Sequence, residues 1–400
     1  MKERSLLLLG GSASQIAAID VANRLGYRTV LCDYLEDNPG QYLADSFHLV
    51  STTDLEGVLS VARSENVSGV VAYSSDPAAP TAAYVARDLG LPGVPYDIAC
   101  SLCEKHLFRS FLIDNGFNAP RSASCAIGSL PDVSDMSFPL IVKPTDSSGS
   151  KGVTVVESSV ALGDALEEAA RYSRNGIVEV EEFIERDHPH VIEAEIFVVG
   201  GRVVSWGLMN SIRDAETNPL LPAAYTLPLD LPVEREGIVR AEVSRLVAAT
   251  GVDCGAFNIE MVIDKDNRLF FLDAGPRNGG NMLPEFISAA SGRDIVAATV
   301  LAAMGDVDGV DVSFDGKSGG HWGLGVLHAT RPGVFGGVSY SRLARERLVR
   351  EELGVSLGET LRPFSRCNDL AGLAFFKFEN KAESDAVMLD MNRTMGVIVR

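Results

Sequence analysis

The sequence predicts an α/β protein, with an open parallel-sheet domain at the N-terminus followed by α+β structure built on hairpins. In the first hundred residues, short apolar runs alternate with amphipathic segments, as in βαβ units joined by right-handed crossovers. From about residue 119 the expected strands are joined by tight turns, of which Gly200-Gly201 is the strongest hairpin signal. Hydrophobic residues make up 46% of the 400, which is enough to build sizeable cores.

The N-terminal domain is expected to end near residue 118. Continuous apolar runs indicate buried parallel strands, and apolar residues at helical spacing indicate the helices that pack on them. The expected strands are Ser5–Leu9, Thr29–Cys32 and Val70–Tyr73, and the expected helices are Gln15–Leu25, Leu55–Ala62, Pro80–Leu89 and Leu102–Asn115.

The remaining chain reads as strands joined mainly by hairpins, with two amphipathic helices. The expected strands are Phe138–Lys143, Val153–Glu157, Ile177–Ile184, Val191–Val199 and Arg202–Leu208, and the expected helices are Ala161–Tyr172 and Val233–Ala249. Beyond residue 320 short strands and turns dominate.

The stretch Phe257–Asn281 carries the most informative pattern. Two apolar segments flank a polar turn, and a two-residue turn at Asp266-Asn267 would place Glu260 directly opposite Asp273. The same register pairs Val262 with Phe271, Met261 with Leu272 and Ile263 with Phe270. Opposed carboxylates repel each other unless a cation lies between them, and oxygen ligands without cysteine or histidine suit Mg²⁺ or Mn²⁺. The alternative is that both acids end in solvent at a strand edge.

The residues after Asp273 add an anion ligand to this expected metal site. The turn 274–281 is rich in glycine and presents the guanidinium of Arg277 beside the two acids. Arginine is the side chain best matched to a pair of carboxylate or phosphate oxygens. An arginine on an exposed turn is usually a surface residue, but this position favours an anion ligand.

A second group of residues surrounds Lys143, at the end of an expected strand. The loop Asp146–Gly152 follows, and its serines and glycines can offer backbone N–H groups to phosphates. It is not a Walker A motif, because the Gly-Lys-Ser/Thr ending is absent, and a plain hairpin loop is the alternative. Gly10-Gly11-Ser12 likewise lacks the G-x-G-x-x-G spacing, which counts against an NAD-dependent oxidoreductase.

Two further segments have both a structural and a functional interpretation. Lys105 lies in an expected amphipathic helix, where a solvated surface charge is the simpler interpretation. The segment Glu181–Ile184 ends an apolar strand, where its carboxylates and backbone either hold an adenine amine or end in solvent.

The composition limits the class of partner. With 35 lysines and arginines against 54 aspartates and glutamates, the formal charge of −19 argues against nucleic acid or an anionic membrane. Leu6–Leu9 is too short for a signal-peptide core, and no uncharged apolar run approaches a membrane span. Six scattered cysteines do not form a disulfide framework. A cytoplasmic protein with reduced thiols is therefore expected.

Taken in order, these segments resemble the ATP-grasp superfamily, and more narrowly its carboxylate–amine ligases related to carbamoyl phosphate synthetase and bacterial L-amino acid ligases. The resemblance runs through LLLLGGSASQIAAIDVANRLGYRTVLCD, CEKHLFRSFLIDNGFNAP, FPLIVKPTDSSGSKGV, VEEFI, GAFNIEM and FLDAGPRNGGN. It implies an N-terminal pre-ATP-grasp domain over residues 1–118. It further implies two α+β lobes of an ATP-grasp fold. The small lobe covers residues 119–184 and contains the phosphate loop, Ser147–Gly152. The large lobe covers residues 185–400 and contains the metal site and a β-rich C-terminal subdomain.

The resemblance also implies roles for the matched residues. Glu260 and Asp273 are the implied ligands of Mg²⁺ or Mn²⁺, and Lys143 and Arg277 are the implied catalytic residues. The implied ATP-binding residues comprise two lysines, a mobile loop, an adenine-reading linker and a ribose contact: Lys105, Lys143, Ser147, Ser148, Gly149, Ser150, Lys151, Gly152, Glu181, Glu182, Phe183, Ile184 and His190. His188 is the alternative ribose contact.

The implied reaction is the joining of a carboxylate to an amine through an acyl phosphate, with release of ADP and phosphate. The expected partners are ATP and small carboxylate and amine substrates, without nucleic acid or membrane, and a homodimer is left open. Ser211–Pro232 is expected to line the substrate pocket, where Arg213 either holds a carboxylate or lies on a solvated loop.

One departure from the family pattern concerns the metal. The family often reads Glu-x-Asn-Pro-Arg, whereas this chain has Asp273 in place of the Glu and Gly275 in place of the Asn ligand. Asn281 is one substitute, and phosphates and water are another. Two alternatives to the ligase therefore stay open, namely an ADP-forming enzyme of the purine-pathway type and a non-catalytic ATP-binding regulatory protein.

Overall fold

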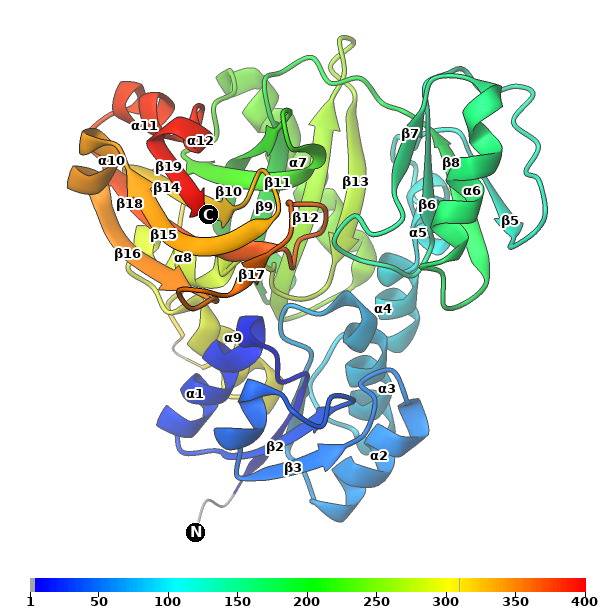
Figure 1. Ribbon diagram of the computed structural model, residues 1–400. Helices are drawn as coiled ribbons and strands as arrows, with labels where there is room; N and C mark the ends of the chain where they lie inside the picture. The colour runs from blue at the N-terminus through cyan, green and yellow to red at the C-terminus, as the bar shows by residue number, and fades with distance from the viewer. Residues whose placement is uncertain (1–3, 309) are drawn as a thin grey trace.

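Residues 4–308 and 310–400, which the computed structural model describes, form an N-terminal domain, a small lobe and a large lobe (Figure 1). The N-terminal sheet is parallel throughout, in the order β3-β2-β1-β4, which confirms the predicted open parallel sheet. Its strands are β1 (Ser5–Leu9), β2 (Arg28–Asp33), β3 (Ser46–Leu49) and β4 (Gly69–Val71). Strand β3 was not predicted, because its Ser-Phe-His-Leu sequence is short and half polar.

Helices cover both faces of this sheet, and one of them comes from a distant part of the chain. The local helices are α1 (Ile16–Arg24), α2 (Leu55–Ser64) and α3 (Ala79–Leu89). Helices α2 and α3 pack on one face. On the other face α1 is joined by α9 (Ile295–Met304), whose Val296 and Val300 share a core with Leu6 and Ile19. The N-terminal core is therefore completed only by residues that lie between β13 (Leu269–Gly275) and β14 (His321–His328) in the chain.

The single helix predicted over Leu102–Asn115 is two helices, α4 (Tyr96–Cys103) and α5 (Lys105–Asp114). Glu104 between them is extended, with φ −107° and ψ 116°. The N–H of Lys105 donates to the Thr145 carbonyl at 2.9 Å, so the break ties the start of α5 to the small lobe. Helix α5 then packs on the sheet of the large lobe through buried apolar side chains.

The small lobe is an antiparallel sheet in the order β5-β8-β6-β7, with one helix on it. Its elements are β5 (Ser122–Ala126), β6 (Leu140–Pro144), β7 (Thr154–Val156), α6 (Leu162–Ala170) and β8 (Ile177–Glu182). The leucines and alanines of α6 recur at helical spacing and form a small core with the sheet. The predicted elements of this region are confirmed to within two residues at each end, whereas β5 was not predicted.

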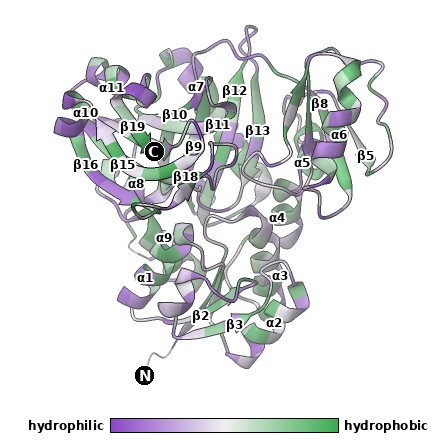
Figure 2. Cartoon of the chain, viewed as in Figure 1, coloured by the Kyte–Doolittle hydropathy of each residue, from purple (hydrophilic) through white to green (hydrophobic). Residues whose placement is uncertain are grey.

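The large lobe is built on a sheet in the order β13-β12-β9-β10-β11-β14-β18-β16. Its strands are β9 (Val191–Val199), β10 (Arg202–Asp214), β11 (Asn218–Leu227), β12 (Gly255–Ile263), β13 (Leu269–Gly275), β14 (His321–His328), β16 (Leu348–Leu353) and β18 (Leu370–Phe378). Helices α5 and α7 (Val233–Thr250) cover one face, and α8 (Leu283–Ser291) covers part of the other. Figure 2 shows hydrophobic residues along these strands and hydrophilic ones on peripheral helices such as α10 (Arg342–Arg347).

The C-terminal part of the large lobe is rich in strands, as predicted, and carries a second small sheet in the order β17-β15-β19. Its further elements are β15 (Gly333–Tyr340), β17 (Thr360–Leu361), α11 (Lys381–Met388), α12 (Met391–Thr394) and β19 (Met395–Val399). The six cysteines, all within the described ranges, are free. In the described chain no single helix is long and apolar enough to cross a membrane. Helices α8 and α9 reach the required length and apolar composition only when taken together, and they are bent by 114° relative to each other.

A buried histidine–aspartate pair fastens this C-terminal part to hairpin β10–β11. His328 Nε2 lies 3.0 Å from Asp214 Oδ2, and Asn392 donates to the same oxygen at 3.0 Å. Burial alone would raise the pKa of the Asp214 carboxyl, but hydrogen bonds from Thr217, His328 and Asn392 lower it to about 2. The carboxylate therefore stabilises the fold in its ionised form.

We expect Asp214→Asn to lower the free energy of unfolding at pH 7 by about 1–3 kcal/mol, the loss typical of a buried charged hydrogen-bond acceptor. A carboxyl with a lowered pKa stabilises the native state above its ordinary value of 3.8, and this contribution disappears as the pH falls toward 2. The difference between wild type and variant in urea unfolding should therefore shrink between pH 7 and pH 3. Asp114→Asn, at an exposed position, is the control, and a pH-independent difference would contradict the assignment.

Candidate active site

Hairpin β12–β13 forms the edge of the large sheet that faces the small lobe (Figure 1). Glu260 lies directly opposite Asp273, as the sequence predicted. The other predicted pairs are wrong by one residue: Met261 pairs with Phe271, Val262 with Phe270 and Ile263 with Leu269. The turn has three residues and is closed by a bond from the Asp264 N–H to the Arg268 carbonyl at 3.0 Å. A bulge after Glu260 then shifts the register back, so the two errors cancel at the acids.

Glu260 has a third carboxylate beside it. On the other side of β12 it lies opposite Glu193 of β9, which gives a row Asp273–Glu260–Glu193 across three strands. Burial and the charge of Glu260 raise the pKa of Glu193 well above its usual value. Asp273 is different: its burial is outweighed by the charges of Lys105 and Lys143, which lower its pKa.

Arg213 joins this row from β10. Its Nη2 donates to Glu260 Oε2 at 3.2 Å, and its side chain is 11% exposed. The prediction that Ser211–Pro232 is irregular enough to leave Arg213 on a solvated loop is wrong, because β10 continues to Asp214 and β11 begins at Asn218. The four prolines of this stretch misled the prediction, although only two of them lie within a strand.

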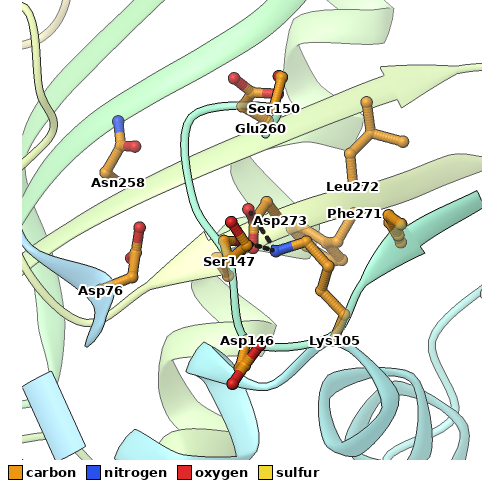
Figure 3. A network of polar contacts seen from close by, with 12 residues as sticks. Asp76, Lys105, Asp146, Ser147, Ser150, Asn258, Glu260, Phe271, Leu272 and Asp273 are labelled. Atoms are coloured by element: carbon orange, nitrogen blue, oxygen red, sulfur yellow. Dashed lines mark hydrogen bonds and ion pairs between the residues drawn. The ribbon is translucent and has the colours of Figure 1, made fainter. Parts of the chain in front are cut away.

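Lys105 links the phosphate loop to the acids. Its Nζ donates to the Ser147 carbonyl at 3.0 Å and lies 3.6 Å from Asp273 Oδ2 (Figure 3). The side chain is 12% exposed, so the interpretation as a solvated surface charge is wrong. As the first residue of α5, Lys105 is directed into the cleft by the break at Glu104.

Lys143 belongs to a buried network of three charges. Its Nζ lies 2.7 Å from Glu181 Oε2, while Arg109 Nε donates to Glu181 Oε1 at 2.8 Å. The guanidinium of Arg109 also donates to the carbonyls of Phe271 and Leu272 in β13, at 3.3 and 2.8 Å. Burial lowers the pKa of Lys143 to about 8, and the charge of Glu181 limits the fall. Sequence reasoning missed Arg109, because the helical pattern around it indicated only an amphipathic helix.

The structure gives Glu181 a different role from the predicted one. Both of its carboxylate oxygens are already bound by Arg109 and Lys143, so the side chain is not available to read an adenine amine. Glu182 turns to the outside of the lobe, where it accepts from the Ser137 N–H at 2.8 Å. Phe183 donates its N–H to the Pro139 carbonyl at 3.0 Å, and the strand ends before Ile184.

Neither predicted ribose histidine is brought to the acids. His188 Nε2 accepts from the Ile263 N–H at 3.0 Å, which fastens the linker to the end of β12. His190 lines a small hollow with Asn210 and Thr226. Ser211 and Tyr225 point to the same face of the sheet as Glu193. Asn210 and Thr226 are their neighbours along the strands and therefore point to the opposite face, where the hollow lies. His190 therefore faces away from the acids, and its role as the ribose contact stays a prediction.

The phosphate loop bridges the two lobes. Three of its residues have positive φ, namely Gly149 (68°), Ser150 (55°) and Gly152 (71°). Ser150 Oγ donates to the Leu220 carbonyl of β11 at 3.3 Å. Gly149 lies against Cys367 of the C-terminal part, so that a Cβ at this position would be 3.4 Å from the cysteine side chain. Ser148 and Lys151 lie in the same loop, which therefore spans the cleft that contains Asp273.

Arg277 is held more tightly than an exposed turn would allow. Its Nε and Nη2 donate to the two oxygens of Asp76, both at 2.6 Å, and Nη1 donates to Asn258 Oδ1 at 3.0 Å. The alternative that Arg277 is an exposed surface arginine is thus wrong. Asp76 comes from the N-terminal domain, in a short helical turn (Asp76–Ala78) that follows β4. Its position just beyond the carboxyl end of a parallel strand was the available sequence signal.

The Asp76–Arg277 pair also explains the glycine in place of the expected asparagine ligand. A Cβ on Gly275 would lie 2.5 Å from Asp76 Oδ1 and 2.9 Å from Arg277 Nε. Asn281, the suggested substitute ligand, donates its Nδ2 to the Tyr225 hydroxyl at 3.1 Å, and its role at the metal stays a prediction. Within the described ranges no group of three or more His, Cys, Asp or Glu side chains is arranged to hold a metal.

The residues present nevertheless fit a cation that is completed by a substrate. Glu260 and Asp273 offer carboxylate oxygens with side chains 31% and 43% exposed toward the cleft. Oxygen donors of this kind suit Mg²⁺, which usually takes only one or two protein carboxylates and fills its remaining positions with phosphate oxygens and water.

Comparisons with known proteins agree with this geometry. Residues 129–274 match the family model described as D-ala D-ala ligase C-terminus. The carbamoyl phosphate synthase large chain of Neisseria meningitidis serogroup B is 26% identical over 244 residues, which cover 60% of this chain and 22% of that protein. That of Vibrio parahaemolyticus is 26% identical over 290 residues, which cover 70% of this chain and 26% of that protein. The chain thus spans about a quarter of the length of these relatives.

Solved structures match over the full length. The L-amino acid ligase from Bacillus licheniformis has a TM-score of 0.80 at 21% identity and is covered completely, as is this chain. The phosphoribosylglycinamide synthetase from Anaerococcus prevotii has a TM-score of 0.75 at 18% identity, covering 99% of this chain and 100% of that one. The chain has the ATP-grasp fold. The resemblance drawn from the sequence and the predicted fold class are confirmed, and the domain boundaries of this ATP-grasp protein stay a prediction.

In this ATP-grasp protein we expect Arg109→Met to lower the free energy of unfolding by about 3–5 kcal/mol, because it leaves part of a buried charge network without its partner. Denaturant unfolding measures the loss. Arg63→Met, which breaks an exposed pair with Asp88, is the matched control and should lose less than about 1 kcal/mol. Equal losses in the two variants would show that the buried network contributes nothing special.

The lowered pKa of Lys143 predicts that a phosphate ligand bound beside it would lose affinity at high pH. A lysine with a pKa of about 8 loses its charge as the pH rises from 7 to 9, so the affinity for a non-hydrolysable ATP analogue should fall severalfold over this range. Lys143→Met should bind weakly and without this dependence, as measured by calorimetry. If the variant retained the slope of the wild type, another group would be responsible.

Proposed function

We propose that this protein is an ATP-dependent carboxylate–amine ligase. It would form an acyl phosphate from a carboxylic or amino acid and ATP, release ADP, and join the acyl group to an amine. The observation that carries the proposal is the convergence on one cleft of Lys105, the phosphate loop and the opposed pair Glu260–Asp273. The relatives support it, since the Bacillus licheniformis protein is a ligase, the Anaerococcus prevotii protein a synthetase and the Neisseria meningitidis protein a synthase.

The residues of the cleft suit the binding of a triphosphate. Lys105 already contacts the backbone of the phosphate loop, and Lys143 lies charged at neutral pH in the adjoining network. Mg²⁺ held by Glu260 and Asp273 would offset the negative charge on the transferring phosphoryl group. The loop Ser147–Gly152, which spans from the small lobe to β11, would keep water from the acyl phosphate.

The proposed chemistry has two displacements. A carboxylate oxygen of the substrate attacks the γ-phosphorus, and the bond from that phosphorus to ADP breaks. The amine nitrogen then attacks the acyl carbon, the bond to phosphate breaks, and the amine proton leaves with the phosphate. Arg277, fixed by Asp76 and Asn258, would stabilise the oxyanion of the tetrahedral intermediate.

A second candidate is an ADP-forming enzyme of the purine-pathway type. Its support is the likeness to phosphoribosylglycinamide synthetase over almost the whole of both chains. A non-catalytic ATP-binding protein is the third, because Gly275 removes a ligand that the family often has. For all three we propose ATP and Mg²⁺ as ligands, and the cytoplasmic location and the homodimer stay predictions.

An assay of ADP release separates these candidates. The protein is incubated with MgATP and a panel of amino acids and small carboxylates, with and without an amine, and separately with phosphoribosylamine and glycine. Release that depends on a carboxylate and an amine supports the ligase, and release only with phosphoribosylamine supports the purine type. Tight binding of ATP without release for any member of the panel would overturn the ligase.

We expect Glu260→Gln and Asp273→Asn each to lower turnover at least a hundredfold, because each removes a carboxylate from the proposed metal site. Asp266→Asn, in the exposed turn of the same hairpin, is the control and should keep full activity. Circular dichroism and denaturant unfolding verify that the variants are folded. Full activity in either site variant would refute the metal assignment.

A further inference from the structure

Three buried polar atoms near Glu260, on strands β9 and β10, have no hydrogen-bond partner. Six such side-chain atoms occur in the part of the chain that the structure describes, and half of them are Glu193 Oε2, Ser211 Oγ and Arg213 Nη1. An unpaired buried polar group costs about 1–3 kcal/mol, and a charged one costs more. Three of them in neighbouring positions, two of them in ionisable groups, therefore indicate a ligand that supplies the missing partners.

The three atoms lie on one face of the sheet, beside Glu260. Glu193 is directly opposite both Glu260 of β12 and Met209 of β10. Ser211 is two residues further along β10 and so shares the face of Met209. Arg213 reaches the same place, because its Nη2 donates to Glu260 Oε2 at 3.2 Å. The unpartnered atoms thus border the carboxylate that we assign to the metal.

The neighbouring contacts fix these side chains while leaving the three atoms free. Glu193 Oε1 accepts from Asn258 Nδ2 at 2.8 Å, and Asn258 Oδ1 in turn accepts from Arg277. Arg213 is held through Nη2. Because Glu193 Oε2 and Arg213 Nη1 both lack a partner, they do not hydrogen-bond each other. The site therefore offers a carboxyl oxygen, a cationic donor and a hydroxyl at the same time.

We propose that this site binds an α-amino acid as the acyl donor of the reaction. Arg213 Nη1 would take its carboxylate, Glu193 Oε2 would take its ammonium group, and Ser211 Oγ would complete the contacts. The guanidinium of Arg213 sets the direction, because the reverse orientation would place the substrate ammonium group against it. The proposed orientation also places the substrate carboxylate next to Glu260, where phosphoryl transfer must occur. This inference rests on the proposed ligase function and names its substrate class.

Direct binding to the wild-type protein tests the inference. Calorimetry is carried out with Mg²⁺ and a non-hydrolysable ATP analogue, using the proteinogenic L-amino acids and counterparts that lack one group. For leucine these are 4-methylpentanoate, without the amine, and 3-methylbutylamine, without the carboxylate. At least one amino acid should bind tenfold or more tightly than both of its counterparts. Equal affinity for an amino acid and its deaminated counterpart, or no binding of any amino acid, would overturn the inference.

Two variants assign the contacts. Glu193→Gln should lose the preference for the amino acid over its deaminated counterpart, and Arg213→Met should lose the preference over the amine, with partial rescue in Arg213→Lys. Glu234→Gln and Arg202→Met, at exposed positions, are the matched controls. A preference that survives in both site variants would overturn the assignment, and the analogue series with the wild type stands even if a variant fails to fold.

Parallel measurement of ADP release separates this inference from the proposed function. Amino-acid binding that depends on Glu193 and Arg213, without ADP release, would keep the site and refute the ligase. ADP release with carboxylates that carry no amine, unchanged in Glu193→Gln, would keep the ligase and refute the site.

Discussion

The ion network of Arg109, Glu181 and Lys143 is the interaction on which the cleft depends. It connects α5, two strands of the small lobe and, through the Phe271 and Leu272 carbonyls, the edge strand β13. Removing these charges from water costs free energy. The hydrogen bonds of the network offset this cost, because the Arg109 guanidinium donates to both carboxylate oxygens of Glu181 and also to two backbone carbonyls. Because Lys105 begins the helix that carries Arg109, the same network sets where both lysines stand relative to Asp273.

Local signals account for what the sequence predicted well. Strands β1, β2 and β4 of the N-terminal sheet were predictable because they are largely apolar on both faces, and the Gly200-Gly201 turn indicated hairpin β9–β10. The opposition of Glu260 and Asp273 was predicted from an incorrect two-residue turn and is right because a bulge compensates for the longer turn. A bulge depends on packing across the sheet and leaves no reliable mark in a single sequence.

The parts of the site that sequence reasoning missed come from long-range contacts. Asp76 holds Arg277 across 201 residues of chain, and Arg109 reaches Glu181 across 72. Neither distance is visible as a motif spacing. His190 and Glu181 were assigned by their place in a family pattern, but the first lines a hollow away from the acids and the second is bound by two buried cations. In both cases tertiary structure decides which neighbour an otherwise suitable side chain meets.

Helix α9 makes the N-terminal domain discontinuous in the chain, and this affects how the protein is made. Residues 4–103 leave the ribosome well before residues 295–304, yet the sheet face that carries Leu6 is covered by α1 together with Val296 and Val300 of α9. During synthesis the part of this face that α9 covers stays open while the small lobe and strands β9 to β13 of the large lobe are being produced, a state prone to association with other chains. The first domain to be synthesised is thus completed only after most of the protein has emerged.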